Sequence, residues 1–150
     1  MDEMLMAAET AANSNDVMAE SGDGYARIGE MAKTYGVTLR TLRFYEDKGL
    51  LNPKREGSTR LYSRRDRSRL KLILLGRKVG FSLREVKQIM DLYDPHGANT
   101  KQLKLALEKS EKQIGRLHKQ RAVLDEAISE LSDVIRVVRG KLGERSAQAS

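Results

Sequence analysis

The 150-residue sequence predicts a mainly α-helical protein in two parts, a small basic domain followed by one long helix. Three observations lead to this prediction. Between residues 25 and 93, short apolar stripes at helical spacing are separated by glycine and proline. Residues 25–80 carry 15 Lys and Arg against 5 Asp and Glu. From residue 103 to residue 142, apolar side chains recur at alternating steps of four and three residues, which is the spacing of a coiled coil.

Charge is distributed unevenly along the chain, and this distribution indicates which kind of molecule the protein binds. The formal net charge is +7, yet residues 1–24 contain six acidic residues and no Lys or Arg. The basic block that follows indicates a polyanionic partner, with nucleic acid favoured over a membrane surface. A well-solvated surface is the simpler alternative.

The cellular context follows from what the sequence lacks. It contains no cysteine, which excludes disulfides and thiolate metal sites. No Lys or Arg precedes Arg27, as a signal peptide would need, and no apolar run approaches the length of a membrane span. We therefore expect a cytoplasmic protein with no membrane contact.

The first 24 residues are expected to form a disordered acidic leader, since they are rich in Ala, Asn, Ser and acids and show no sustained helical stripe. An alternative is that the leader folds back on the basic block and competes there with a polyanion.

A helix-turn-helix pattern follows the leader. The stripe of Ile28, Met31 and Tyr35 predicts a short helix that Gly36 ends, because glycine adopts the left-handed backbone of a helix C-terminus at low cost. Thr38 stands where an N-cap belongs. A second helix is expected from there to about Lys48, before Gly49.

The second helix has two different faces. At about 100° per residue, one side carries Leu39, Leu42, Tyr45 and Glu46. Leu39 and Leu42 are expected to face the first helix. The other side carries Arg40, Thr41 and Phe44, with Arg43 on its flank. Arginine can donate two hydrogen bonds to guanine, and threonine or aromatic carbon can contact a thymine methyl or a sugar, so this face suits the major groove of DNA.

Residues 51–63 break the helical pattern. Pro53 opens the segment, and Glu56, Gly57 and Ser58 can form a turn between two extended arms. Basic side chains lie on both arms. Next to a recognition helix, such a hairpin indicates a wing on the phosphate backbone.

Two capped helices follow the wing. Ser63 with Asp66, and Ser82 with Glu85, have the spacing of capping boxes, and Gly80 is expected to end the first of these helices. After a loop, Asn99 is expected to cap the long helix.

The long helix carries a heptad repeat over nearly six heptads, and ten of its twelve core positions are apolar. From residue 99 to residue 142 it would be about 65 Å long. The domain before it is too small to cover such a stripe, so a second copy of the chain is the expected partner. The predicted dimerisation residues are Leu103, Leu107, Ile114, Leu117, Leu124, Ile128, Leu131, Ile135 and Val138. The heptads leave the direction of pairing open. The long helix is expected to fray at Gly140 and Gly143. Residues 143–150 are expected to form a disordered tail.

In this order, the elements closely resemble the MerR family of bacterial transcription regulators. The resemblance spans residues 25–93, and the long helix extends it to about residue 142. It is carried above all by TLRFYEDKGLL at residues 41–51 and TRLYSRRD at residues 59–66. It implies a winged helix-turn-helix domain at residues 25–93 and, at residues 94–142, a linker and a dimerisation helix that pairs as an antiparallel coiled coil.

The resemblance also implies a set of DNA contacts. The recognition helix would contact DNA through Arg40, Thr41, Arg43 and Tyr45. The wing would contact the DNA backbone through Arg60 and Tyr62. A further basic contact would come from Arg77. With Thr38 and Phe44 of the recognition helix, these form the predicted DNA-binding set. Ser58 and Thr59 stand where family members usually carry Gly-Tyr, which puts the detail of the wing contact in doubt.

By resemblance, the dimer binds an inverted repeat in a promoter and distorts the DNA so that RNA polymerase can engage both promoter elements, although some relatives simply repress. Metal-sensing relatives bind their ion through cysteines, and this chain has none. Neither His96 nor His118 has a third ligand near it in the sequence, so no metal site is predicted. Only eight residues follow Leu142, so we expect no appended ligand domain. No cofactor is evident, and the effector is unidentified.

Within the family, SRRDRSRLKLILLGRKVGFSL at residues 63–83 together with LYDP at residues 92–95 is most similar to a subgroup linked to leucine and acyl-CoA breakdown. The alternative function is that of an architectural or recombination-type DNA-binding protein without a regulated promoter. An enzyme is not expected, because no nucleophile–base pair or phosphate-binding loop is present.

Overall fold

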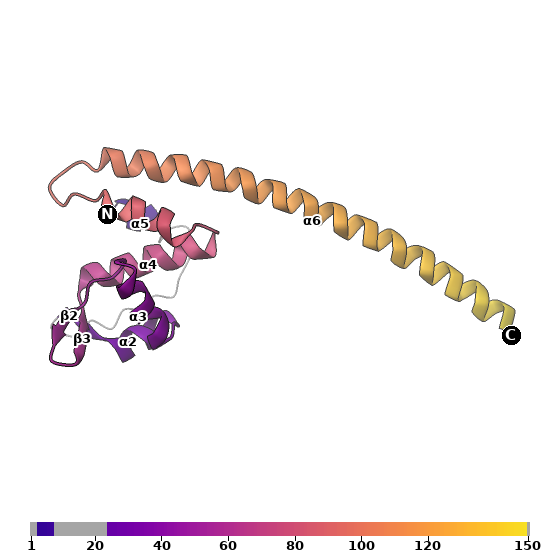
Figure 1. Cartoon of the computed structure of the whole chain (residues 1–150). Coiled ribbons are helices and arrows are strands. Elements are labelled where there is room, and N and C mark those ends of the chain that lie inside the picture. The colour runs from indigo at the N-terminus through magenta and orange to yellow at the C-terminus, as the bar shows by residue number, and fades with distance from the viewer. Residues whose placement is uncertain (1–2, 8–23, 150) are drawn as a thin grey trace. The chain divides into compact units, whose positions relative to one another are not determined.

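The computed structural model describes residues 3–7 and 24–149, which fall in two compact units, residues 1–109 and residues 110–150. The predicted fold class, mainly helical with a winged helix-turn-helix domain and a long C-terminal helix, is confirmed (Figure 1). The elements are β1 (Ala26–Arg27), α2 (Ile28–Tyr35), α3 (Leu39–Asp47), β2 (Lys54–Glu56), β3 (Thr59–Tyr62), α4 (Arg64–Lys78), α5 (Leu83–Asp91) and α6 (Thr100–Ala149).

Local signals place the ends of the first helices where the sequence predicts them. Gly36 has φ of 65° and ends α2, and Gly49 has φ of 72° just after α3. Both values lie in the left-handed region that glycine adopts without a Cβ clash. Thr38 caps α3, because its side chain accepts a hydrogen bond from the backbone N–H of Thr41.

The wing is part of a three-stranded antiparallel sheet in the order β1-β3-β2. Strands β2 and β3 form the predicted hairpin, with Arg55 opposite Arg60 and with Gly57 in the turn at φ of 61°. Strand β1 was not predicted. It pairs Ala26 with Tyr62 and so joins the start of the domain to the wing.

Helices α4 and α5 begin at the predicted capping boxes, Ser63 with Asp66 and Ser82 with Glu85. The two helices pack closely at Gly76. A Cβ atom there would lie only 2.6 Å from Cγ2 of Val86, so no larger residue fits without a shift.

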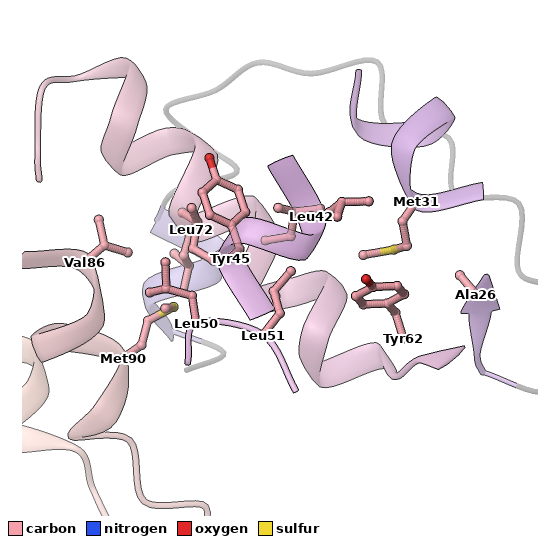
Figure 2. Packing of buried hydrophobic residues seen from close by; sticks show 12 residues of the cluster. Ala26, Met31, Leu42, Tyr45, Leu50, Leu51, Tyr62, Leu72, Val86 and Met90 are labelled. Carbon is pink, nitrogen blue, oxygen red and sulfur yellow. The ribbon is translucent and has the colours of Figure 1, made fainter. Parts of the chain in front are cut away.

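One buried apolar cluster holds the wing and the helices of the first unit together (Figure 2). Its members come from every element between β1 and α5 except β2, and from the segment that joins α3 to the wing. They are Ala26, Met31, Leu42, Tyr45, Leu50, Leu51, Tyr62, Leu70, Leu72, Ile73, Val86 and Met90. Helix α3, the predicted recognition helix, is therefore fixed by the same core that carries the wing.

The structure differs from the expected disordered leader at residues 3–7, which are helical. Leu5 packs against the buried cluster. Burial of this apolar side chain offsets part of the entropy that ordering the segment costs. The other leader residues, 1–2 and 8–23, lie outside the described residues.

The two ends of α6 also differ from the prediction. Asn99 lies directly before the helix and its backbone oxygen accepts a hydrogen bond from the N–H of Leu103, but its side chain accepts one from the backbone N–H of Asp94 and so closes the preceding loop. At the other end, the helix continues through Gly140 and Gly143 to Ala149, where a disordered tail was expected. A glycine inside a helix costs only about 1 kcal/mol relative to alanine, which does not by itself end a helix.

Candidate nucleic-acid interface

The cap of α3 uses two of the predicted DNA-binding residues. The backbone N–H of Thr41 donates to Oγ1 of Thr38 at 3.0 Å, and the two hydroxyl oxygens lie 2.9 Å apart. These hydroxyls are therefore already engaged with each other. The pair holds the first turn of α3 in shape, and its contact with DNA stays a prediction.

The outward side of α3 presents Arg40, Arg43 and Phe44 to solvent, and we call these three residues the outer face. The ammonium of Lys48 lies 5.5 Å from the centre of the Phe44 ring, which adds a cation–π contact. The opposite side of the helix is anchored, because Leu42 is fully buried and Tyr45 is 7 % exposed. The outer face is thus carried on a helix that cannot rotate freely.

Leu39 was predicted to face the first helix with Leu42, but it is 41 % exposed and does not belong to the buried cluster. It lies in the first turn of α3, directly after the cap. Leu42, one turn later, is the residue that enters the core.

Tyr45 combines a buried ring with an accessible end. Figure 2 shows its hydroxyl pointing away from the labelled core side chains. A tyrosine held in this way can bury its ring and keep its hydroxyl for a polar partner. Its predicted DNA contact is compatible with this position and stays a prediction.

The wing is joined to α3 through Glu46, a contact that the sequence patterns did not predict. The Nε–H of Arg60 donates to Oε2 of Glu46 at 2.7 Å, and Nη2 of Arg55 donates to Oε1 at 2.7 Å. We call these three residues the Glu46 junction. No local pattern in the sequence indicates this contact, because Glu46 is 9 and 14 positions away from its two partners.

Glu46 stays charged in this setting. Partial burial alone would raise the pKa of its carboxyl, but the hydrogen bonds and positive charges of Arg60 and Arg55 outweigh burial and hold the pKa below its usual value. Because the folded-state pKa is depressed, the junction contributes stability that is present above the unfolded pKa and is lost as the pH falls through the folded pKa.

Tyr62 cannot make the predicted contact with the DNA backbone, because its side chain is 0 % exposed in the core. Its ring belongs to the cluster that includes Met31 and Ala26 (Figure 2). Its hydroxyl is buried without a hydrogen-bond partner in the described part of the chain, and burial raises its pKa. The assignment fails because resemblance matched the residue type, whereas packing decides where the side chain lies.

We expect the substitution Tyr62→Phe to leave DNA affinity unchanged and to keep or raise the free energy of unfolding by up to about 1 kcal/mol. It removes a buried hydroxyl that has no partner while keeping the ring. Urea unfolding and fluorescence anisotropy with labelled DNA measure the two quantities. Tyr45→Phe is the matched variant. We expect a loss of DNA affinity in Tyr45→Phe but not in Tyr62→Phe. A clear loss of affinity in Tyr62→Phe would restore the backbone contact.

Several arginines that add to the basic charge are not available to a polyanion. Arg67 donates to the backbone oxygen of Gly24 at 2.9 Å, and Arg69 donates to that of Leu50 at 2.8 Å. Burial lowers the pKa of Arg69. These two residues are 9 % and 8 % exposed, so their guanidinium groups stabilise the fold and are not accessible to DNA.

Arg77 lies exposed near the end of α4, where its Nη1 donates to the backbone oxygen of Phe81 at 3.1 Å. One such bond leaves other guanidinium donors for a further contact. Its predicted role at DNA stays a prediction.

The heptad stripe on α6 is open to solvent along most of its length. We call its exposed predicted residues the seam, and each is between 41 % and 63 % exposed. They are Leu107, Ile114, Leu117, Leu124, Ile128, Leu131, Ile135 and Val138. Leu103 differs, since it is half-buried.

Residues 3–7 and 24–149 contain neither a metal-binding cluster nor a membrane-spanning helix. No group of three or more His, Asp or Glu side chains gathers there in a way that could hold a metal ion. None of the helices in those ranges is long and apolar enough to cross a membrane.

Comparison with known proteins gives two matching family models. Residues 26–93 match "MerR HTH family regulatory protein", and residues 67–134 match "MerR, DNA binding". Together the two models extend from β1 into α6, so they include the winged domain, the Glu46 junction and most of the seam.

Individual relatives agree with these models. The HTH-type transcriptional activator TipA of Streptomyces coelicolor is 38 % identical over 103 residues, which is 67 % of this chain and 40 % of TipA. The structure of a MerR-family transcriptional regulator from Bacillus cereus is 28 % identical with a TM-score of 0.60, over 73 % of this chain and 78 % of that one. The regulator PbrR691 of Ralstonia metallidurans CH34, solved in complex with lead(II), is 30 % identical with a TM-score of 0.51, over 69 % of this chain and 82 % of that one.

The chain thus spans less than half the length of TipA. The matched residues 26–134 contain the helix-turn-helix, the wing and the first part of the long helix. The chain belongs to the MerR family of DNA-binding transcriptional regulators.

Proposed function

We propose that this protein is a homodimeric regulator that binds an inverted repeat in a promoter and distorts the DNA between the two half-sites. RNA polymerase at that promoter is then the machinery that responds. In this proposal the protein acts in the cytoplasm by binding and has no enzymatic activity.

The observation that carries the proposal is the outer face of α3. Arg40, Arg43 and Phe44 face solvent from a helix whose other side is fixed by Leu42 and Tyr45 in the core. Arginine side chains on a rigid helix can read guanine edges in the major groove, while a wing reaches the phosphate backbone.

The seam supports the homodimer. Burying even half of one exposed leucine or isoleucine contributes on the order of 1 kcal/mol, and the seam repeats that gain eight times. A second copy of α6 presents the same spacing of apolar residues. In an antiparallel pair, Arg121 near the middle of the helix would approach its own mate, and Asp125, one turn on, would compensate the charge.

A dimer with two winged domains fits an inverted repeat, because the two-fold symmetry of the protein matches that of the DNA. A protein that holds both half-sites can stabilise a bent or untwisted DNA shape, whose energy depends on sequence. Promoter control in this way needs no catalytic group.

The effector is proposed not to be a metal held by thiolates, although PbrR691 was solved with lead(II). The sequence of this chain contains no cysteine, the ligand that such a site uses. The similarity of residues 63–83 to the subgroup linked to leucine and acyl-CoA breakdown makes target genes of that pathway our proposal.

The test is an affinity selection of sheared genomic DNA on the purified protein at moderate salt, followed by sequencing. We expect enrichment of a few inverted repeats inside promoters, next to genes that identify the pathway. Uniform recovery that declines steadily with salt would mean that the protein binds phosphate without reading bases. The architectural or recombination-type function would then replace the proposal.

A further inference from the structure

The Glu46 junction connects the two parts of the surface that are proposed to meet DNA. Glu46 lies in the last turn of α3, while Arg55 and Arg60 are register partners on β2 and β3. Both guanidinium groups donate to the same carboxylate at 2.7 Å, one to each oxygen. The wing is thus tied to the recognition helix by side chains in addition to the core.

The junction has the properties of a strong contact. Charge-assisted hydrogen bonds of this length are roughly twice as strong as neutral ones. The side chains of Glu46 and Arg60 are only 18 % and 19 % exposed, so water competes weakly for that bond. The side chain of Arg55 is 52 % exposed, and its bond is correspondingly weaker.

We propose that Glu46 is a positioning residue that sets how far this protein discriminates between its site and other DNA. It acts through Arg55 and Arg60, which hold the wing in place, and it keeps both guanidinium groups from binding phosphates indiscriminately. This inference rests on the proposed function, in which α3 reads bases and the wing meets the backbone.

The proposed role of Glu46 follows from the different roles of backbone contacts and base contacts in DNA binding. Backbone contacts fix the register of a protein on the duplex but carry no sequence information themselves, so they serve specificity only when rigidly related to the helix that reads bases. Two mobile arginines would instead raise affinity for any duplex. Each additional phosphate contact steepens the dependence of log K on log salt by about 0.9.

The test is Glu46→Gln in the full chain, which removes the charge and keeps the shape of the side chain. Two labelled probes are used, a duplex recovered by wild-type protein from genomic DNA and a scrambled duplex of equal composition. We expect the ratio of affinities for the two probes to fall at least about tenfold. The salt dependence with the scrambled duplex should steepen by about 1 to 2.

Glu56→Gln is the matched control. Glu56 lies at the tip of the same wing, where it is exposed and pairs only loosely with Lys54 at 3.6 Å. The control loses the same charge from the same surface but leaves the junction intact. Its affinity ratio should stay within about twofold of wild type. An equal fall in both variants would show a plain charge effect and would overturn the positioning role.

A second measurement does not depend on DNA. In Glu46→Gln, hydrogen exchange of the wing amides at residues 54–62 should be faster than in wild type by about tenfold, while the amides of α4 keep their wild-type rates. Unchanged exchange in the wing would overturn the inference, because the junction would then not hold the hairpin.

The two measurements separate failure of the inference from failure of the proposed function. If wild-type protein prefers its selected duplex and Glu46→Gln prefers it equally, only the positioning role of Glu46 is wrong. If wild-type protein binds both duplexes equally, the proposed function fails and the discrimination role fails with it.

Discussion

Replacement of Arg43 by alanine is expected to lower affinity for the selected duplex by about 10- to 100-fold and to leave the dimer intact. Arg43 is exposed on α3, which the core holds through Leu42 and Tyr45. A bidentate contact from arginine to a base contributes about 1–3 kcal/mol, which corresponds to this range. Because the side chain is exposed, its removal does not disturb the core.

Fluorescence anisotropy with the selected and scrambled duplexes, at one fixed salt concentration, measures the effect. Arg84→Ala is the matched control, since Arg84 is an exposed arginine on α5. It changes the net charge by the same amount, so its effect should be small and equal on both probes. If Arg43→Ala binds the selected duplex as wild type does, the assignment of α3 as the recognition helix is wrong.

The second large effect is expected from Leu124→Glu, which should raise the dissociation constant of the dimer by on the order of a hundredfold or more. Leu124 lies on the seam and is 62 % exposed in the single chain. In a coiled-coil dimer, the substitution would replace an apolar contact by an acidic side chain in each copy of the interface, which is strongly unfavourable. DNA affinity should fall in parallel, because a monomer holds only one half-site.

Val123→Glu is the matched control, because it makes the same kind of change at the neighbouring residue. Val123 is 66 % exposed and adjacent in sequence, but it lies off the heptad positions. The same acidic change should therefore leave the dimer nearly as stable as in wild type. Light scattering over a concentration series measures the assembly. Loss of the dimer in both variants, or in neither, would contradict the seam as the dimer interface.

Sequence patterns predicted the local features well. Gly36 and Gly49 end their helices, Ser63 and Ser82 begin theirs, and the hairpin turns at Gly57. Each of these signals acts over a few residues, where backbone sterics and cap hydrogen bonds outweigh distant contacts. The resemblance to the family rested above all on the residues at positions 41–51 and 59–66.

The misassigned residues share a different cause. Leu39 was placed inside and is exposed, while Tyr62 was placed at DNA and is fully buried. Helical and strand periodicity states which residues share a side, but it does not state which side another element covers. Asn99 likewise has a good capping residue type, yet its side chain bonds to the preceding loop.

The sequence by itself determined the helices between residues 28 and 91, the caps at Thr38, Ser63 and Ser82, the wing hairpin, the heptad repeat and the basic charge, because each depends on neighbours close along the chain. Only the tertiary structure decided the pairing of β1 with β3, the burial of Tyr62 and the meeting of Glu46 with Arg55 and Arg60. These contacts join residues 9 to 36 positions apart, such as Ala26 with Tyr62. Their partners are selected by how the core closes in space, which no local pattern encodes.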